Sequence, residues 1–191
     1  MPFMNHSRLR AAAVGLAAAA AVLAAGPVAA NASAAPSDVF TGKREINIAP
    51  SGTEGILSVS ESGRVELADL AEDRALFVPV PTAPGSDQFM IKTGRLRVGG
   101  EALCLGVRNN GTSSLTVQST ACDASRSAQK FTFEPAGRND SGRDLYYIGN
   151  RGAHFRITQA GALIVEETGD GPAPAAFALL DRGPSQLPDL D

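Results

Sequence analysis

The chain has 191 residues, a length that fits one domain, or one domain with tails. Its hydrophobic content of 43% is enough for a folded core, and its charged content of 19% is too low for a disordered polyelectrolyte. The formal net charge of -3 lacks the positive balance of nucleic-acid-binding proteins, so no nucleic-acid partner is expected.

Residues 1–34 have the layout of a secretory signal peptide. Arg8 and Arg10 form a short basic region, and residues 11–25 are apolar, rich in alanine and uncharged. Residues 32–34 (Ala-Ser-Ala) fit the small-residue rule for cleavage. The alternative, a membrane anchor, needs a longer and more hydrophobic segment to span a bilayer. We therefore expect a secreted, extracellular protein that is not inserted in a membrane after cleavage.

After the signal peptide, short alternating runs bounded by Gly, Asn, Ser and Pro replace any sustained helical period, which is typical of an all-β domain. Twelve strands are predicted, at 45–49, 56–60, 64–68, 88–92, 95–98, 103–107, 115–118, 129–134, 145–149, 154–158, 162–166 and 176–180.

The predicted strands form three groups of four that align with one another. Equivalent places hold Leu57-Ser58-Val59, Leu105-Gly106-Val107 and Phe155-Arg156-Ile157, then Val65, Leu115 and Leu163, then Phe89, Phe131 and Phe177. The three phenylalanines are separated by 42 and 46 residues, which indicates an internal repeat. Three four-stranded blades are too few to close a propeller, so three such units predict a six-stranded barrel with a hairpin cap, the β-trefoil.

The expected all-β domain, a β-trefoil, covers residues 44–180. Its three repeats lie at about 44–93, 94–136 and 143–180. An N-terminal extension, 35–43, precedes the domain. The last residues, 181–191, contain two prolines and no periodic pattern, so we expect a flexible acidic tail.

One proline-rich segment interrupts the first group. Residues 75–85 (ALFVPVPTAPG) contain three prolines among apolar residues. Because proline cannot donate to a β-ladder, the segment predicts an extended loop or an edge segment. Such a loop is either pinned to the domain by Leu76, Phe77 and Val78, or it projects and binds a partner.

The second repeat carries a recognisable pattern between residues 103 and 133. It consists of Cys104-Leu105-x-Val107, a second cysteine at Cys122, and Gln129-x-Phe131. This pattern resembles the ricin-B-type lectin domain, a β-trefoil of many secreted proteins and carbohydrate-binding modules. At Phe131 this chain has phenylalanine, where that family usually has tryptophan. The clear resemblance covers about 30 residues, and a weaker threefold pattern covers most of the domain.

Cys104 and Cys122 are expected to form a disulfide. They are eighteen residues apart, on predicted strands joined by the turn Asn109-Asn110-Gly111. Closing a loop of this length is worth about 3 kcal/mol by the chain-entropy model. The alternative is two buried free thiols, which the secretory signal disfavours because exported proteins fold in an oxidising compartment.

The sugar-binding positions that the resemblance implies are mostly degenerate. The family places an aspartate directly after the Cys-Leu pair, an aromatic ring near the second cysteine, and polar amides around them. In this chain the acid positions hold Gly106, Ser58 and Arg156, the ring position Thr120, and one amide position Ala128. The galactose-type site of the second repeat is therefore not expected, because its directional contacts are missing.

Six polar or aromatic residues remain as candidates for ligand binding: Arg108, Asn109, Gln118, Gln129, Tyr146 and Tyr147. The resemblance implies that the glutamine of Gln-x-aromatic has a largely structural role, and that the aromatic residue fills the core. Of the adjacent pair Tyr146 and Tyr147, one side chain should face the core, because neighbouring strand residues point to opposite sides.

Catalysis and metal binding have little support in the sequence. His154 is the sole histidine after the signal peptide, and no G-x-S-x-G elbow accompanies it. One histidine and two cysteines that are expected to pair do not make a zinc site. No enzyme activity, metal or cofactor is therefore expected.

The sequence predicts a secreted, non-catalytic binding module. The first hypothesis is a monomeric carbohydrate-binding module, ricin-B-type and lectin-like, with an atypical or lost sugar site. The alternative is a module that binds an extracellular protein, such as a peptidase inhibitor that presents the proline-rich loop 78–86, since prolines reduce the entropy lost on binding.

Overall fold

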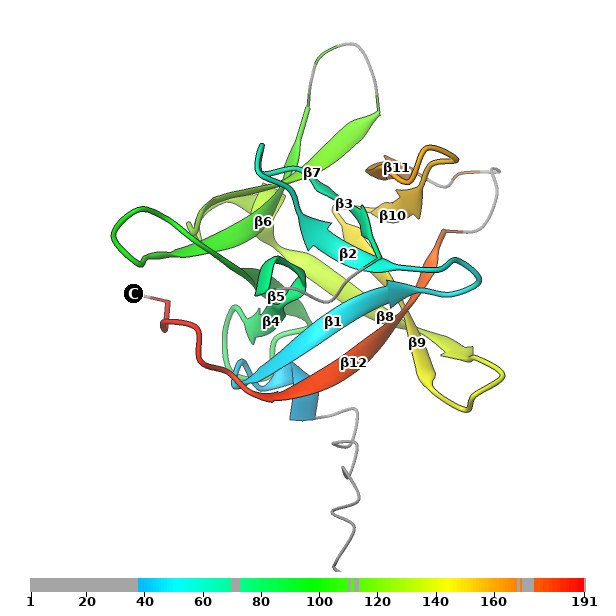
Figure 1. Ribbon diagram of the computed structural model, residues 1–191, viewed down its shortest axis with the longest axis horizontal. Helices are drawn as coiled ribbons and strands as arrows, with labels where there is room; N and C mark the ends of the chain where they lie inside the picture. Colours follow the sequence, from blue (N-terminus) through cyan, green and yellow to red (C-terminus); the bar gives the residue numbers. More distant parts are fainter. Residues whose placement is uncertain are drawn as a thin grey trace, which may run out of the picture. The chain divides into compact units, whose positions relative to one another are not determined.

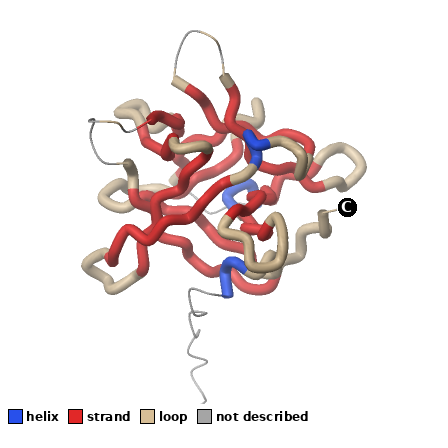
Figure 2. Tube along the Cα trace, turned by 180° about the vertical axis from the view of Figure 1, so that it is seen from behind, coloured by secondary structure: helices blue, strands red, loops and turns tan. Residues whose placement is uncertain are grey.

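β-Strands separated by tight turns dominate the part of the chain that the structure describes, residues 38–69, 73–109, 111, 114–167, 169 and 174–190 (Figure 1). Within these residues the computed structural model has three 3-10 helices of a single turn: η1 (Asp38–Phe40), η2 (Asp73–Ala75) and η3 (Ser127–Gln129) (Figure 2). The all-β prediction is confirmed. The expected signal peptide, 1–34, lies outside the described residues, and no helix within them is long and apolar enough to cross a membrane.

The described strands follow one another in three groups of four. The first group is β1 (Arg44–Pro50), β2 (Ile56–Val59), β3 (Val65–Ala68) and β4 (Phe77–Pro81). The second group is β5 (Gln88–Leu96), β6 (Ala102–Arg108), β7 (Leu115–Ala121) and β8 (Phe131–Arg138). The third group is β9 (Asp144–Asn150), β10 (Ala153–Ile157), β11 (Leu163–Glu167) and β12 (Ala176–Pro184).

The first and last strands of the three groups close into a ring. Their order is β5-β4-β1-β12-β9-β8, and pairing of β8 with β5 joins the two ends. The middle strands form the antiparallel hairpins β2–β3, β6–β7 and β10–β11. These hairpins touch one another through the β7–β11 pairing and through single bridges from β3 to β7 and β11. The result is a six-stranded barrel with a cap of three hairpins.

Alternating side chains of all three groups meet in one apolar core. Phe77, Phe131, Phe155 and Phe177 are each 0% exposed. The ring centroids of Phe131 and Phe155 are 5.5 Å apart, and those of Phe155 and Phe177 are 6.1 Å apart. Full burial of one such ring stabilises the fold by about 1.5–3 kcal/mol, so these four residues hold the three groups together.

The predicted boundary between the first two groups is wrong. Residues 88–92 and 95–98 were expected as two strands, whereas residues 88–96 form the single strand β5. The fourth strand of the first group is instead β4, inside the proline-rich segment that was expected to be a loop. Phe77 of β4, and not Phe89, therefore stands in the place of Phe131 and Phe177.

The prolines of β4 are tolerated because of the direction in which their nitrogens point. Gly94 N donates to Leu76 O at 2.7 Å, and Thr82 N donates to Gln88 O at 2.9 Å. The alternation of an antiparallel ladder then turns the backbone groups of Pro79 and Pro81 away from β5. On that other side β4 meets β1 at a single residue pair, so few donors are needed there.

The hairpin registers correct a second predicted equivalence. Val59 lies opposite Val65, Val107 opposite Val117, and Ile157 opposite Leu163. The equivalent of Val65 and Leu163 in the second group is thus Val117, two residues beyond Leu115. Both residues point to the same face of β7, because side-chain direction repeats every two residues along a strand, so the apolar pattern alone cannot separate them.

The expectation of a flexible tail from residue 181 onward is also wrong for the described residues. Asp181–Pro184 continue strand β12, and the Asp181 carboxylate forms an ion pair with Arg44. Ser185 N donates to Lys43 O at 2.8 Å, and Gln186 N donates to a Glu45 carboxylate oxygen at 2.7 Å. The sequence suggested a loose tail because these partners come from β1, far away along the chain.

Lys92 of β5 also holds this C-terminal segment. Its side chain is 1% exposed, and Nζ donates to Pro188 O at 2.7 Å. Burial lowers the pKa of Lys92, because the charged ammonium loses hydration. The folded protein therefore binds this proton less tightly than the unfolded chain does, and stability rises as pH increases from the folded pKa toward 10.5.

Lys92→Met is expected to remove this part of the pH dependence and to release residues 186–190. The lost charged hydrogen bond should weaken docking of the segment by about 1.5–3 kcal/mol. Urea unfolding between pH 8 and pH 10.5 and trimming by carboxypeptidase measure the two effects. The exposed lysine variant Lys43→Met is the control, and equal pH profiles and trimming rates for both variants would contradict the assignment.

Candidate functional site

The second hairpin, β6–β7, carries the disulfide that the sequence predicts. Cys104 and Cys122 are bonded, with their Cα atoms 4.9 Å apart. Cys104 lies in β6 opposite Thr120 and is 0% exposed, whereas Cys122 directly follows β7 and is partly exposed. The bridge ties the start of the loop between β7 and η3 to the hairpin.

Gln129 holds the same loop from the other end. Its side chain is 1% exposed. Nε2 donates to Ala121 O at 2.8 Å, and Oε1 accepts from Asp123 N at 2.7 Å. Both ends of its amide are thus used by the backbone on either side of Cys122, which agrees with the structural role that the resemblance implies.

Asp123 orders the turn that follows the disulfide. Its carboxylate accepts hydrogen bonds from Ser125 Oγ at 2.5 Å and from Ser125 N at 2.9 Å. These hydrogen bonds, the side-chain one foremost, lower the pKa of Asp123 by favouring the charged form. Arg126 Nε also donates to this carboxylate at 2.9 Å, so the turn presents the arginine toward the hairpin.

A hollow of about 370 Å³ lies between the hairpin and η3. We refer to it as the hairpin-two pocket; the residues that line it include Gly106, Arg108, Gln118, Thr120, Arg126 and Gln129. A Cβ atom at Gly106 would lie 3.2 Å from Thr120 Cγ2 and 3.4 Å from Gln129 Cγ. Thr120 and Gln129 thus pack closely against the Gly106 backbone, which leaves little room for a side chain at this position.

The polar groups of the hairpin-two pocket are mainly hydrogen-bond donors. Arg108 Nη1 donates to Gln118 Oε1 at 3.1 Å, which orients both side chains on the exposed side of the hairpin. The described residues that line the pocket include two arginines and no carboxylate. Such a set can bind polar or anionic groups of a ligand.

The corresponding places in the other two hairpins are different. In the third hairpin Arg156, at the position that corresponds to Gly106, forms an ion pair with Glu166 at 2.8 Å. Ser114 Oγ adds a hydrogen bond to the same carboxylate at 2.9 Å. In the first hairpin Ser58 lies opposite Glu66. The polar residues at these places therefore differ in charge from repeat to repeat.

Of the six predicted binding residues, Arg108, Gln118 and Gln129 meet in this pocket. Asn109 is elsewhere: its Oδ1 accepts from Gly111 N at 2.7 Å, and it lines a separate hollow of about 740 Å³ between the second and third hairpins. Arg126 was missed. A basic residue between the second cysteine and the Gln-x-Phe motif is the sequence signal that could have identified it.

Tyr146 and Tyr147 lie on β9, outside the hairpin-two pocket. The Tyr146 ring packs edge-on to Phe40 at 5.4 Å, and burial raises the pKa of Tyr146. The Tyr147 ring lies 6.4 Å from the ring of His154, also edge-on. Both tyrosines are half-buried and neither belongs to the buried core, so the expectation that one of them faces the core is not confirmed, and neither joins Arg108 and Gln118.

His154 has few partners among the described residues. Its Nε2 lies 3.7 Å from a Glu134 carboxylate oxygen, and its buried Nδ1 has no hydrogen-bond partner there. It does not line the hairpin-two pocket. No group of His, Cys, Asp and Glu side chains within the described ranges is arranged to hold a metal ion.

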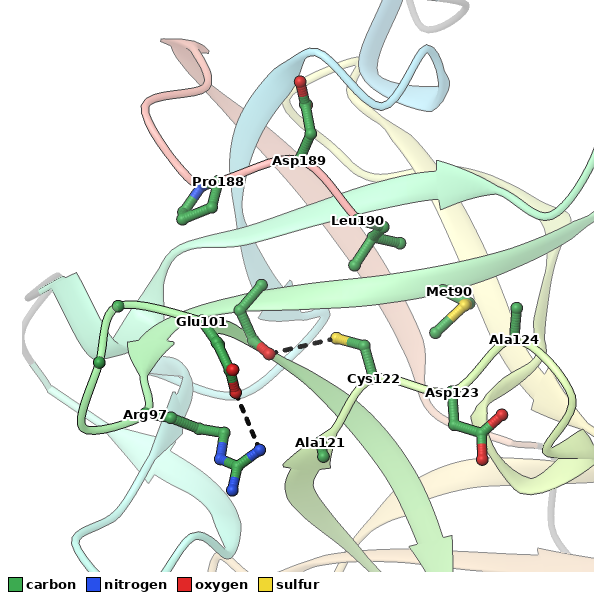
Figure 3. A pocket seen from close by; sticks show the side chains of 13 residues that line it. Met90, Arg97, Glu101, Ala121, Cys122, Asp123, Ala124, Pro188, Asp189 and Leu190 are labelled. Carbon is green, nitrogen blue, oxygen red and sulfur yellow. Dashed lines mark hydrogen bonds and ion pairs between the residues drawn. The ribbon is translucent and has the colours of Figure 1, made fainter.

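The C-terminal segment forms one wall of a further hollow of about 430 Å³ (Figure 3). Pro188, Asp189 and Leu190 line this hollow together with the turn between β5 and β6, where Arg97 forms an ion pair with Glu101 at 2.9 Å. Sequence reasoning missed this hollow because it assigned the segment to a flexible tail.

Comparison with known proteins shows the fold. No family model and no curated protein matches the sequence. Among solved structures, the β-trefoil BEL superposes with a TM-score of 0.54 at 15% identity, over 72% of this chain and 92% of BEL. SeviL bound to asialo-GM1 saccharide superposes with a TM-score of 0.51 at 11% identity, over 73% of this chain and 98% of SeviL. A Polyporus squamosus lectin bound to Neu5Aca2-6Galb1-4GlcNAc superposes with a TM-score of 0.53 at 12% identity, over 73% of this chain and 49% of the lectin chain.

These similarities agree with the pairing of the strands. The closed ring of six strands with three hairpins is the β-trefoil architecture that the repeats predict. At these identities the similarity applies to the fold alone, and the chemistry of any binding site has to come from the residues of this chain.

Proposed function

We propose that this protein is a secreted, non-enzymatic, monomeric carbohydrate-binding module that holds its ligand in the hairpin-two pocket. The observation that carries the proposal is the convergence of Arg108, Gln118 and Gln129 on one open hollow. Arg108 of β6 and Gln118 of β7 reach it from the hairpin, while the Gln129 side chain fixes the backbone on either side of Cys122 with two hydrogen bonds. Preformed polar hollows of this kind favour ligand binding, because little ordering is needed.

The similar solved structures support the choice of ligand class. SeviL is described with asialo-GM1 saccharide, and the Polyporus squamosus lectin with a sialylated trisaccharide. Both share the fold of this chain and differ from it in nearly nine of every ten aligned residues, so they support a saccharide as ligand without indicating which one.

The proposed extracellular location is supported by two features. Residues 1–34 have the pattern of a secretory signal peptide. The disulfide between Cys104 and Cys122 is of a kind that persists in oxidising compartments.

A peptidase inhibitor is not retained as a second proposal. Its motivation was a projecting loop at residues 78–86. The first half of that segment belongs to β4, where Phe77, Val78 and Pro79 are buried. The remainder is a tight turn in which Thr82 and Ser86 hydroxyls are 3.0 Å apart.

Gln118→Ala is expected to weaken glycan binding about 2- to 10-fold, the effect of losing one neutral hydrogen bond. A glycan array followed by titration of the strongest ligand measures the change, and pull-down on insoluble polysaccharides extends the search. Gln88→Ala, which removes an exposed glutamine of β5, is the matched control and should bind as the parent does. Absence of retention on every glycan and polysaccharide would refute the proposed function.

A further inference from the structure

We propose that the hairpin-two pocket recognises an anionic group of its glycan, either a sulfate ester or a carboxylate. This inference rests on the proposed function and names the ligand class. It follows from the charge of the pocket, the free donors of its arginines and the charge of the rest of the chain.

The two arginines approach the pocket from different walls. Arg108 stands at the end of β6 on the hairpin side, and Arg126 immediately precedes η3 on the other side. A ligand group between them would meet positive charge from two directions. Guanidinium groups bind sulfate and carboxylate oxygens through paired N–H donors, which adds geometric selectivity to the charge.

The absence of lining carboxylates distinguishes this pocket from its neighbours. The hollow beside the C-terminal segment is lined by Glu101, Asp123 and Asp189 as well as by Arg97. The hollow between the second and third hairpins is lined by Glu166 and Glu167 as well as by Arg151. In both of these hollows acidic side chains offset the arginine, whereas the described lining of the hairpin-two pocket has no acid that would repel an anion.

Arg108 keeps most of its donors for a ligand. Its one side-chain hydrogen bond goes to the neutral amide of Gln118, and no described carboxylate forms an ion pair with it. Arg126 is partly engaged, because its Nε donates to Asp123. Both guanidinium groups thus retain terminal N–H groups, and Arg108 carries the uncompensated charge.

A third arginine lies next to the pocket. Arg64 is exposed and forms a backbone bridge with Gln118, so the two side chains leave their strands on the same face. Glu66, two residues further along the chain, bridges Ala162 instead. Arg64 therefore places a further positive charge on the face of the sheet that carries Gln118.

The overall charge of the chain opposes general attraction of polyanions. The formal net charge is -3, and removal of Arg8 and Arg10 with the signal peptide would make the protein more acidic. Exposed charges farther apart than about 10 Å are screened at ordinary ionic strength, so a retained anion must be held locally. Nucleic acids, which need an extended basic surface, are not the ligands that this arrangement favours.

The test compares glycans that share a backbone and differ in charge. The purified protein is titrated against dextran, carboxymethyl dextran and dextran sulfate, and in parallel against hydroxyethyl cellulose, carboxymethyl cellulose and cellulose sulfate. We expect the charged member of at least one series to bind tenfold or more tightly than the neutral member. The sulfated and carboxylated arms then identify the source of the anion.

Two arginine variants assign the binding to the pocket. Arg108→Gln is expected to reduce binding of the preferred anionic glycan by about 10- to 100-fold, the range for loss of a charged hydrogen bond. Arg182→Gln makes the same change in net charge at an exposed position of β12 and should bind as the parent does. Arg108→Lys, which keeps the charge and loses the paired donors, should give an intermediate affinity.

The outcomes separate the two levels of the proposal. Equal binding of neutral and anionic glycans, or binding that Arg108→Gln leaves unchanged, overturns the anionic ligand while glycan binding itself stands. Retention of duplex DNA as strong as that of the sulfated glycans also overturns it, because the site would then respond to any polyanion. If no glycan of either series or of an array binds, the proposed function fails together with the inference.

Discussion

Replacing Gln129 with alanine is expected to lower the free energy of unfolding by about 2–4 kcal/mol, since each buried backbone group that loses its partner costs about 1–3 kcal/mol. The variant would leave Ala121 O and Asp123 N without the amide that now satisfies both. It would also leave a small cavity, because Gln129 is 1% exposed. Against a total stability of about 5–15 kcal/mol for an ordinary domain, this is a large loss.

Chemical denaturation monitored by circular dichroism measures this effect, and Gln118→Ala is the matched control. Both glutamines line the hairpin-two pocket, but Gln118 is partly exposed and its amide oxygen accepts from the exposed Arg108 side chain. We expect Gln118→Ala to change the free energy of unfolding by less than about 0.5 kcal/mol. If the two variants were equally stable, the structural role of Gln129 would have to be abandoned.

Removing the disulfide is expected to destabilise the domain by about 3 kcal/mol. In the double variant Cys104→Ala with Cys122→Ala, the unfolded chain is no longer constrained by a cross-link spanning 18 residues. The chain-entropy model attributes the loss to the greater freedom of the unfolded state. Reduction of the parent protein should lower its free energy of unfolding by the part of this loss that comes from the cross-link alone.

The comparison of the double variant with the reduced parent separates two contributions. Reduction removes the cross-link alone, whereas the variant also removes the buried Cys104 sulfur from its packing environment. Titration of free thiols in the denatured, unreduced parent provides the direct check. Two reactive thiols per chain, or a denaturation midpoint that reductant does not change, would be incompatible with the bridge.

The two predictions concern one loop that determines the shape of the pocket. Residues 122–128 leave the hairpin at the disulfide and return to it at Gln129, and Arg126 projects from the middle of this loop. Loss of either tether should let Arg126 move away from Arg108. Measured affinity for an anionic glycan should therefore fall in both variants even under conditions in which they remain folded.

The sequence alone determined the features that depend on neighbouring residues. Alternation of apolar and polar side chains predicts strands wherever one face is buried, and eleven of the expected strands lie wholly or largely within observed ones. The disulfide was predicted from two cysteines, one in the first strand of a predicted hairpin and one beyond its second strand, in a protein with a signal-peptide pattern. The structural role of Gln129 and the burial of Phe131 followed from the resemblance of the second repeat, because these residues sit within about 30 residues of continuous similarity.

The tertiary structure alone decided the features that depend on distant partners. Pro79 and Pro81 indicated a loop, but their backbone faces a side of β4 where few donors are needed, which only the barrel creates. The last residues lack any periodic pattern, yet Lys92, Glu45 and Lys43 from other strands hold them in place. Tyr146 lies on the barrel strand β9, away from the hairpin that carries Arg108, whereas the loop tethered by the disulfide and Gln129 brings Arg126 to that hairpin.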